Sequence, residues 1–184
     1  MWIRNTSQYP LDEVKRLVRF AASQFDRTTT SRLCVNIRNC KQTYHGNAYF
    51  SVPHVSNAPR TARSLVVLRI GAPEKFPSSN IQQTIRWVTL KPGEVCDPSE
   101  IRYTTYYMPK RVVAKRRVLT DLPYGGAGSP VIVTQDWQEA LLVLAAHEFM
   151  HIDQYQHSRP TSEVEAERMA AVVLERYRNA QEAK

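Results

Sequence analysis

The chain has 184 residues, 42% of them hydrophobic, so it is the size of one domain and can bury a core. Its longest aliphatic run, residues 141–146, is far short of the ~20 apolar residues of a membrane span, so we expect no membrane partner. The net charge of +8 favours an anionic partner such as nucleic acid or an acidic protein. No secretory signal is recognisable at the N-terminus, which favours a cytoplasmic chain. Sparse cysteines argue against a disulfide scaffold and fit a reducing compartment: Cys34, Cys40 and Cys96.

The first part of the chain shows one helical pattern followed by strand patterns. Residues 11–25 place apolar side chains at helical spacing and predict an amphipathic helix. Residues 32–38 and 44–52 predict two strands, with a turn at residues 39–42 between them. Residues 64–70, with the sequence SLVVLRI, predict a third strand that is apolar enough to be buried.

The middle of the chain is predicted to be mostly loop, followed by two strands. Residues 71–100 are rich in proline, serine and glycine, with a short strand expected at residues 85–90. Residues 101–108 and 112–119 predict two more strands. The run LPYGGAGSP at residues 122–130 predicts a loop, either a lid or a plain connector. It is not a phosphate-binding loop, because no Gly-Lys-Ser/Thr follows.

A long helix is predicted after this loop. Thr134 or Asp136 can cap its start, and Glu139, three residues past Asp136, completes a capping box. The pattern then continues to about Gln156.

A second helix is predicted at the C-terminal end. Pro160 ends any continuation of the first helix, and Ser162 with Glu165 forms another capping box. The second helix should run over residues 163–179. The order of helix, strands and two helices predicts a single α+β domain over residues 1–184.

The strongest chemical signal is the run His147-Glu148-Phe149-Met150-His151 on the first of these helices. Histidines four residues apart lie on one helix face, so both imidazoles can reach one ion. Zinc prefers nitrogen and sulfur ligands in a tetrahedron, and catalytic sites leave one position open for water. Glu148 can take a proton from that water and later give it to a leaving amine. The alternative is a buried helix whose histidines are only hydrogen-bonded.

The second helix offers a third ligand. Glu163 and Glu167 share the core-facing stripe with Ala166 and Ala170, because residues three and four apart are neighbours on a helix. A carboxylate on that stripe, opposite two histidines, predicts Glu163 as the metal ligand. Glu167, one turn on, is the predicted acceptor for a histidine N–H. Glu165 points elsewhere, and its capping role already explains it, so it is an alternative ligand. Acidic residues favour helix N-termini, which explains why several glutamates occur at the start of this helix. It does not explain why Glu163 and Glu167 lie on its core-facing side.

His157 is the other alternative ligand. It follows His151 by six residues, which is the spacing of the metzincin pattern HExxHxxGxxH. That pattern needs a glycine where this chain has Gln154. We therefore expect His157 to cap the C-terminal end of the helix, beside its negative dipole.

The run HEFMH followed by SEVEAERMA resembles the gluzincin arrangement, in which a helix bearing HExxH meets a second helix bearing a glutamate. The run from Glu163 to Glu167 resembles the second-helix motif of the CAAX prenyl peptidases and of small single-domain zincins of phage and bacterial type. In those proteins the first glutamate binds the metal and the acid four residues on supports a histidine. Glu167 stands where aspartate or asparagine is usual. The resemblance covers about residues 130–178.

The resemblance implies a zincin-like α+β fold, with a small mixed or antiparallel sheet packed on the active-site helix. It also implies one zinc ion and hydrolysis of a peptide or other amide bond by metal-activated water. The edge strand of such a sheet pairs with the substrate backbone, and a strand within residues 101–119 could play that part. Tyr106, Tyr107 and Tyr124 are either oxyanion donors or ordinary half-buried strand residues.

Two other functions remain open from the sequence. A zincin fold can be non-catalytic and serve as a binding or structural component of a larger assembly, such as a phage particle. The chain could also be a nucleic-acid-associated protease. Support for that function is a set of cations that also fits the solvent face of a strand: Lys110, Arg111, Lys115, Arg116 and Arg117.

Overall fold

The computed structural model describes residues 1–51 and 61–183, which fall into two compact units. The first, here called the core unit, comprises residues 1–80 and 124–184, and the second, here called the ribbon, comprises residues 81–123. All residues that are buried in the described chain belong to the core unit. The prediction that residues 1–184 form one domain stays a prediction.

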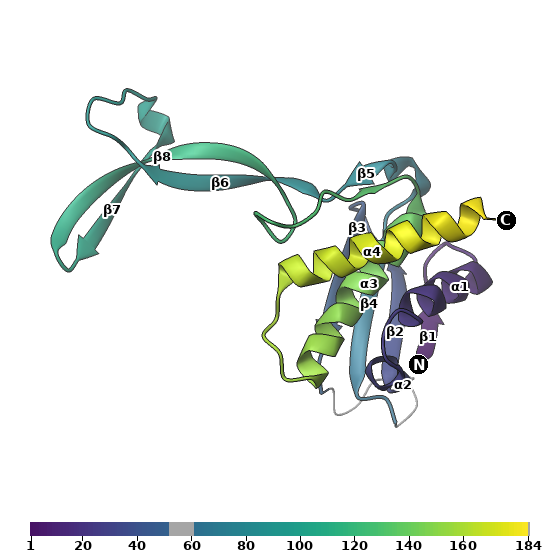
Figure 1. Cartoon of the computed structure of the whole chain (residues 1–184). Coiled ribbons are helices and arrows are strands. Elements are labelled where there is room, and N and C mark those ends of the chain that lie inside the picture. The colour runs from purple at the N-terminus through teal and green to yellow at the C-terminus, as the bar shows by residue number, and fades with distance from the viewer. Residues whose placement is uncertain (52–60, 184) are drawn as a thin grey trace. The chain divides into compact units, whose positions relative to one another are not determined.

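A four-stranded mixed sheet forms one side of the core unit (Figure 1). Its order is β1-β2-β4-β3, with β1 parallel to β2, β2 parallel to β4, and β3 antiparallel to β4 at the edge. The strands are β1 (Trp2–Asn5), β2 (Leu33–Asn39), β3 (Tyr44–Tyr49) and β4 (Ser64–Ile70). The predicted α+β class is confirmed, and the sheet is mixed as expected.

The strand predictions are confirmed for β2 and β4 and need adjustment elsewhere. The second predicted strand, residues 44–52, extended to Val52, which lies outside the described residues, whereas β3 ends at Tyr49. β4 lies between β2 and β3, so the turn at residues 39–42 does not join neighbouring strands. The short strand β1 was not predicted, because four residues that include Arg4 carry too little apolar pattern.

Four helices complete the core unit: α1 (Leu11–Ala22), α2 (Arg27–Ser31), α3 (Trp137–Gln156) and α4 (Glu163–Glu182). Helix α3 packs against β3, β4 and α1, and α4 lies along α3 (Figure 1). Helix α1 ends before the predicted Phe25, and α4 runs beyond the predicted residue 179. Within the described residues, none of the helices combines the length and the apolar character needed to cross a membrane.

The predicted N-cap residues of α3 and α4 are confirmed, but the return bond of a capping box is absent at both: Glu139 accepts from the backbone N–H of Gln135, and the backbone N–H of Ser162 donates to Gln154. The side chain of Asp136 accepts a hydrogen bond from the backbone N–H of Glu139 at 2.9 Å. The hydroxyl of Ser162 accepts one from the backbone N–H of Glu165 at 3.3 Å. These bonds satisfy amides that the helix cannot pair internally and so fix where each helix begins.

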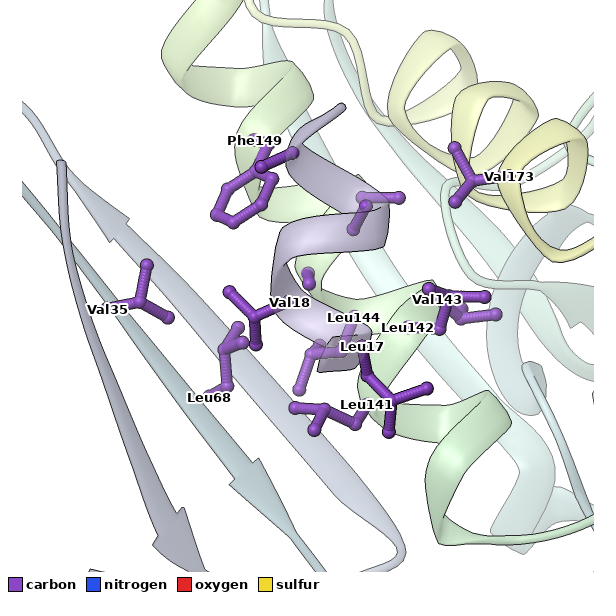
Figure 2. Packing of buried hydrophobic residues seen from close by; sticks show 14 of the residues in the cluster. Leu17, Val18, Val35, Leu68, Leu141, Leu142, Val143, Leu144, Phe149 and Val173 are labelled. Atoms are coloured by element: carbon purple, nitrogen blue, oxygen red, sulfur yellow. The ribbon is translucent and has the colours of Figure 1, made fainter. Parts of the chain in front are cut away.

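The hydrophobic core lies between the sheet and helices α1 and α3 (Figure 2). Leu17 and Val18 of α1 meet Val35 and Leu68 of the sheet, and Phe149 of α3 is fully buried beside them. Helix α3 is buried nearly all round, since α4 covers the side that the sheet and α1 leave open. The HExxH run therefore lies on the most enclosed of the described helices.

The ribbon is a three-stranded antiparallel sheet of order β6-β8-β7. Its strands are β6 (Ile81–Thr89), β7 (Ile101–Tyr107) and β8 (Lys110–Pro123). The short strand predicted at residues 85–90 is part of β6, which begins four residues earlier than predicted, and the loop predicted at residues 122–130 starts two residues later. Strand β6 is rich in glutamine and threonine and has a weak local signal, but it pairs with β8 over its whole length.

Short elements complete the described chain. The two-residue strands β5 (Ser78–Ser79) and β9 (Val133–Thr134) pair antiparallel within the core unit. Two 3-10 turns lie at η1 (Pro73–Lys75) and η2 (Pro98–Glu100). The three cysteines are free thiols, as expected.

Candidate metal centre

Helices α3 and α4 bring the predicted ligands together. His147 and His151 are buried on α3, and Glu163 is the first residue of α4, with its side chain 44% exposed. Nε2 of His147 lies 3.1 Å from Nε2 of His151. Oε2 of Glu163 lies 3.2 Å from the first nitrogen and 3.5 Å from the second. These three atoms form a small triangle, and the three residues make up a group that could hold a metal ion.

The size of this triangle fits zinc. Ligand atoms about 2.0–2.1 Å from a tetrahedral zinc ion are separated from one another by roughly 3.3 Å. The observed separations of 3.1, 3.2 and 3.5 Å bracket that value. Oε2 of Glu163 is buried and has no hydrogen-bond partner among the described residues. A buried carboxylate oxygen without such a bond is costly, and a cation between the three atoms would remove that cost.

Glu167 lies beside His147, and its predicted role as the acceptor for a histidine N–H stays a prediction. Its Oε1 lies 3.0 Å from Nδ1 of His147, close enough for an ion pair although not aligned for a hydrogen bond. The other oxygen of Glu167 accepts a hydrogen bond from Nδ2 of Asn80 at 2.6 Å. Asn80 is itself fixed, because it donates to the carbonyl of Pro130 and accepts from the backbone N–H of Ile132.

Gln154 forms a hydrogen bond with His151. Its Oε1 lies 3.1 Å from Nδ1 of His151, and its Nε2 donates to Glu165 at 2.9 Å. The same Oε1 accepts from the backbone N–H of Ser162, so the amide oxygen faces the imidazole. Since an amide oxygen only accepts, Nδ1 of His151 is the donor, and in the neutral ring the Nε2 lone pair faces the triangle.

The two alternative ligands lie outside the triangle. Glu165 accepts from Gln154 and from Arg159, whose guanidinium lies 2.6 Å away, so it acts on His151 only through Gln154. His157 is exposed at the C-terminal end of α3, where its Nδ1 lies 2.9 Å from the carbonyl oxygen of Asp153. The expected capping position of His157 is confirmed.

Glu148 is buried beside the triangle and faces the edge strand β3. A side chain at Gly46 would overlap the carboxylate of Glu148, so only glycine leaves room for it at this position. Glycine within a strand often marks such a close approach. The strand and the carboxylate are therefore in direct contact.

Burial and neighbouring charges shift the protonation of the site. Burial raises the pKa of Glu148 to about 7, with His147 lowering it and Glu163 raising it. For His147, burial acts to lower the pKa, but the carboxylates of Glu163, Glu167 and Glu148 outweigh it and raise the pKa to about 9. Three carboxylates around two imidazoles hold an excess of negative charge, which a proton or a cation can balance.

Two tyrosines border the site. The ring of Tyr124 lies 5.8 Å from the ring of His147, and burial together with Glu163, Glu148 and Glu167 raises its pKa. The hydroxyl of Tyr44, on β3, is buried without a hydrogen-bond partner among the described residues. Burial and the charge of Glu167 raise its pKa to about 12.

Other predicted residues lie elsewhere. Tyr106 and Tyr107 belong to the ribbon, so Tyr124 is the member of the predicted trio that borders His147. The edge strand was expected within residues 101–119, but the strand at the edge of the sheet beside α3 is β3. The expectation failed because chain order was taken as a guide to position, whereas β3 joins the sheet through pairing with β4.

The glycine-rich loop after β8 packs on the start of α4. Gly125 has a φ of +84°, and a side chain there would meet Ser129 and the backbone of Glu163. The carbonyl of Gly128 accepts a hydrogen bond from Arg168 at 3.3 Å. The loop thus contacts the residue that carries the third ligand atom.

Three residues of the site were missed from the sequence: Asn80, Gln154 and Gly46. Gln154 lies three residues after His151 on the same helix, a spacing that could have revealed it. The glycine within the predicted strand 44–52 was likewise a usable signal. Asn80 has no local signal, because its partner Glu167 is 87 residues away.

Comparison of this chain with protein-family models, with curated proteins and with solved structures finds no match.

Proposed function

We propose that this protein is a zinc-dependent metallopeptidase of the gluzincin type. His147, His151 and Glu163 hold one zinc ion, and Glu148 is the general base and then the general acid. The observation that carries the proposal is the triangle of ligand atoms, with separations of 3.1, 3.2 and 3.5 Å, beside a buried carboxylate. Support of each histidine by a second buried side chain is typical of zinc sites.

The chemistry divides between the ion and the protein. When bound, zinc is a Lewis acid that polarises a carbonyl and lowers the pKa of water toward neutrality. Glu148 accepts the proton that the water loses during attack on the amide carbonyl, and then delivers it to the departing amine. Tyr124 borders His147 on a partly exposed surface and is the nearest candidate to donate a hydrogen bond to the oxyanion.

The edge strand β3 is the proposed docking strand for the substrate. One side of its backbone has no strand partner among the described residues, because β3 is last in the sheet order. An extended peptide can add to such an edge through main-chain hydrogen bonds. Gly46 has no side chain, so the Glu148 carboxylate lies directly against the strand at this point. A peptide that pairs with β3 there would lie close to that carboxylate.

Metal content of the purified protein tests the ligand set. We expect close to one zinc ion per chain in the wild type, with loss in His147→Ala, His151→Ala and Glu163→Ala. Matched controls are His157→Ala and Glu175→Gln, which change an exposed histidine and an exposed acid on or beside the same helices and should retain zinc. A wild-type chain that takes up no zinc when it is supplied would disprove the metal site.

Cleavage of a peptide library then tests the activity. Glu148→Gln should keep its zinc and lose activity by roughly a hundredfold to ten-thousandfold, as expected for removal of a general base. If the wild type holds zinc but Glu148→Gln leaves every measured property unchanged, the chain is a non-catalytic metal-binding protein and the proposed activity is wrong.

A further inference from the structure

The strand register of the ribbon divides its side chains between two faces. Residues that pair across an antiparallel ladder point to the same side of the sheet, and neighbours along a strand alternate. Trp87 pairs with Arg117, Tyr106 pairs with Arg111, and Arg102 pairs with Lys115. The three β8 partners, residues 111, 115 and 117, are an even number of positions apart, so their side chains point to the same side of the sheet. All six residues therefore lie on one side, here called the Trp87 face.

Cations and aromatic rings are interleaved on the Trp87 face. The guanidinium of Arg102 lies over the ring of Trp87, 5.8 Å from its centroid. Arg111 and Lys115 lie 5.3 and 5.4 Å from the centroid of the Tyr106 ring. Trp87 and Tyr106 are each 37% exposed as residues, so the cation–ring pairs lie at the surface.

The charge of this face is not balanced by acids. Within the part of the chain that the structure describes, none of its four cations has a carboxylate within ion-pair distance: Arg102, Arg111, Lys115 and Arg117. The carboxylate that shares the face on β8 is Asp121, four residues beyond Arg117. A surface of this kind attracts an anion and leaves its apolar rings for contact.

The opposite face is different, although it also carries Arg86, Lys110 and Arg116. Arg116 is paired with Glu94, whose Oε1 lies 2.5 Å from its Nε. The cation–ring pairs of the ribbon all belong to the Trp87 face. The two faces therefore provide a matched comparison within a single sheet.

We propose that the Trp87 face binds single-stranded nucleic acid. The four cations would contact phosphates, while Trp87, Tyr106 and the guanidinium planes beside them would stack on bases. A duplex keeps the faces of its bases stacked inside, where Trp87 and Tyr106 cannot stack on them, and an acidic peptide offers carboxylates without a base to stack. Interleaved rings and cations thus favour a single strand over both. This binding does not depend on the proposed metal site.

Fluorescence anisotropy of the full chain with a labelled oligo(dT) strand tests the charge contribution. The triple variant Arg111→Gln, Lys115→Gln and Arg117→Gln should reduce the slope of log affinity against log salt by about two, since each single-strand phosphate contact contributes roughly 0.7. The matched control, which neutralises Arg86, Lys110 and Arg116 on the opposite face, should change affinity much less. Equal losses in the two variants would overturn the assignment to the Trp87 face.

A second pair of variants tests stacking. Trp87→Leu should weaken oligo(dT) binding by about fivefold to a hundredfold, as expected for the loss of one stacked base. Tyr103→Leu, on the opposite face, should have little effect. Circular dichroism should show that both variants are folded. Full affinity of Trp87→Leu for oligo(dT) would then overturn the proposed stacking contacts.

Competition identifies the class of ligand. Unlabelled oligo(dT) should displace the probe better than the same strand in a duplex, and polyglutamate should displace it poorly. A duplex or polyglutamate that competes as well as the single strand would overturn the proposal, as would no binding at low salt. Because EDTA and His147→Ala should leave oligo(dT) binding unchanged, failure of the metallopeptidase proposal and failure of this one give different results.

Discussion

The core unit buries several charged side chains, whereas the ribbon buries none. In the core unit, Glu148 and Glu167 are buried, and Glu167 is fixed by a second buried side chain, Asn80. In the ribbon none of the residues 81–123 is buried, and the cations lie on open sheet faces. A substitution in the first region therefore disturbs several partners at once, whereas one in the second changes mainly what the surface attracts.

The largest expected difference between the two regions is the cost of removing an apolar side chain. Phe149 is fully buried on α3, so Phe149→Ala should lower the free energy of unfolding by about 3–5 kcal/mol. Val112 in the ribbon is 66% exposed, so Val112→Ala should change it by no more than about 0.5 kcal/mol. Urea denaturation measures both, and similar costs for the two variants would contradict the comparison.

A second comparison adds a methyl group to one glycine in each region, Gly46 in the core unit and Gly93 in the ribbon, and measures peptide cleavage. Gly46→Ala should displace the Glu148 carboxylate and lower peptide cleavage by about a hundredfold, because small misplacements of a catalytic group have effects of that size. Zinc content should stay the same, since the atoms that an added methyl group meets first all belong to Glu148, which is not one of the proposed ligands.

Gly93→Ala is the matched control in the ribbon, where an added methyl group meets nothing within 4 Å. Its φ of +81° makes alanine strained there by about 1 kcal/mol, so stability should fall slightly while cleavage is unchanged. Loss of cleavage in Gly93→Ala, or full cleavage in Gly46→Ala, would argue against the role given to the contact with Glu148.

The smallest effect concerns two ion pairs, one in each region. Burial acts to raise the pKa of Glu139, but hydrogen bonds from Arg178 and from the backbone N–H of Gln135 outweigh it, so the pKa is lowered overall. A carboxyl whose folded pKa is lowered stabilises the fold above its ordinary pKa of about 4.3. That stability is lost as the pH falls through the lowered value.

Arg178→Gln should therefore cost about 1–3 kcal/mol at pH 7, because a mostly buried carboxylate loses its charged partner. The difference from wild type should shrink toward pH 3, although the bond from Arg178 to the carbonyl of Val133 is lost at every pH. In the ribbon, Arg116→Gln breaks a partly exposed pair with Glu94 and should cost only about 0–1 kcal/mol. Denaturation curves at several pH values measure both, and a pH-independent cost for Arg178→Gln would exclude this linkage.

The sequence predicted those parts of the site that depend on spacing within a helix. His147 and His151 are one turn apart, and Glu163 and Glu167 share a stripe, so helical geometry alone places each pair. The N-caps at Asp136 and Ser162 were equally local. The distances of the ligand triangle were not predictable, since they depend on how α3 packs on α4.

The remaining features depend on contacts between distant parts of the chain. The position of β4 between β2 and β3, and the length of β6, follow from strand pairing that the local pattern does not encode. The predicted edge strand within residues 101–119 was wrong for the same reason. Asn80 could not be identified because its partner, Glu167, lies on the last helix.

The ribbon leaves and re-enters the core unit through two residues that are joined to each other. The backbone N–H of Tyr124 donates to the carbonyl of Asn80 at 2.8 Å, and Ile81 pairs with Pro123 directly beyond them. Because the two ends of the insertion already meet, a short Asn-Gly turn could close the gap in place of residues 81–123. The insertion is thus modular: evolution or an engineer could exchange it to change the partner of the protein, and zinc content should survive the exchange.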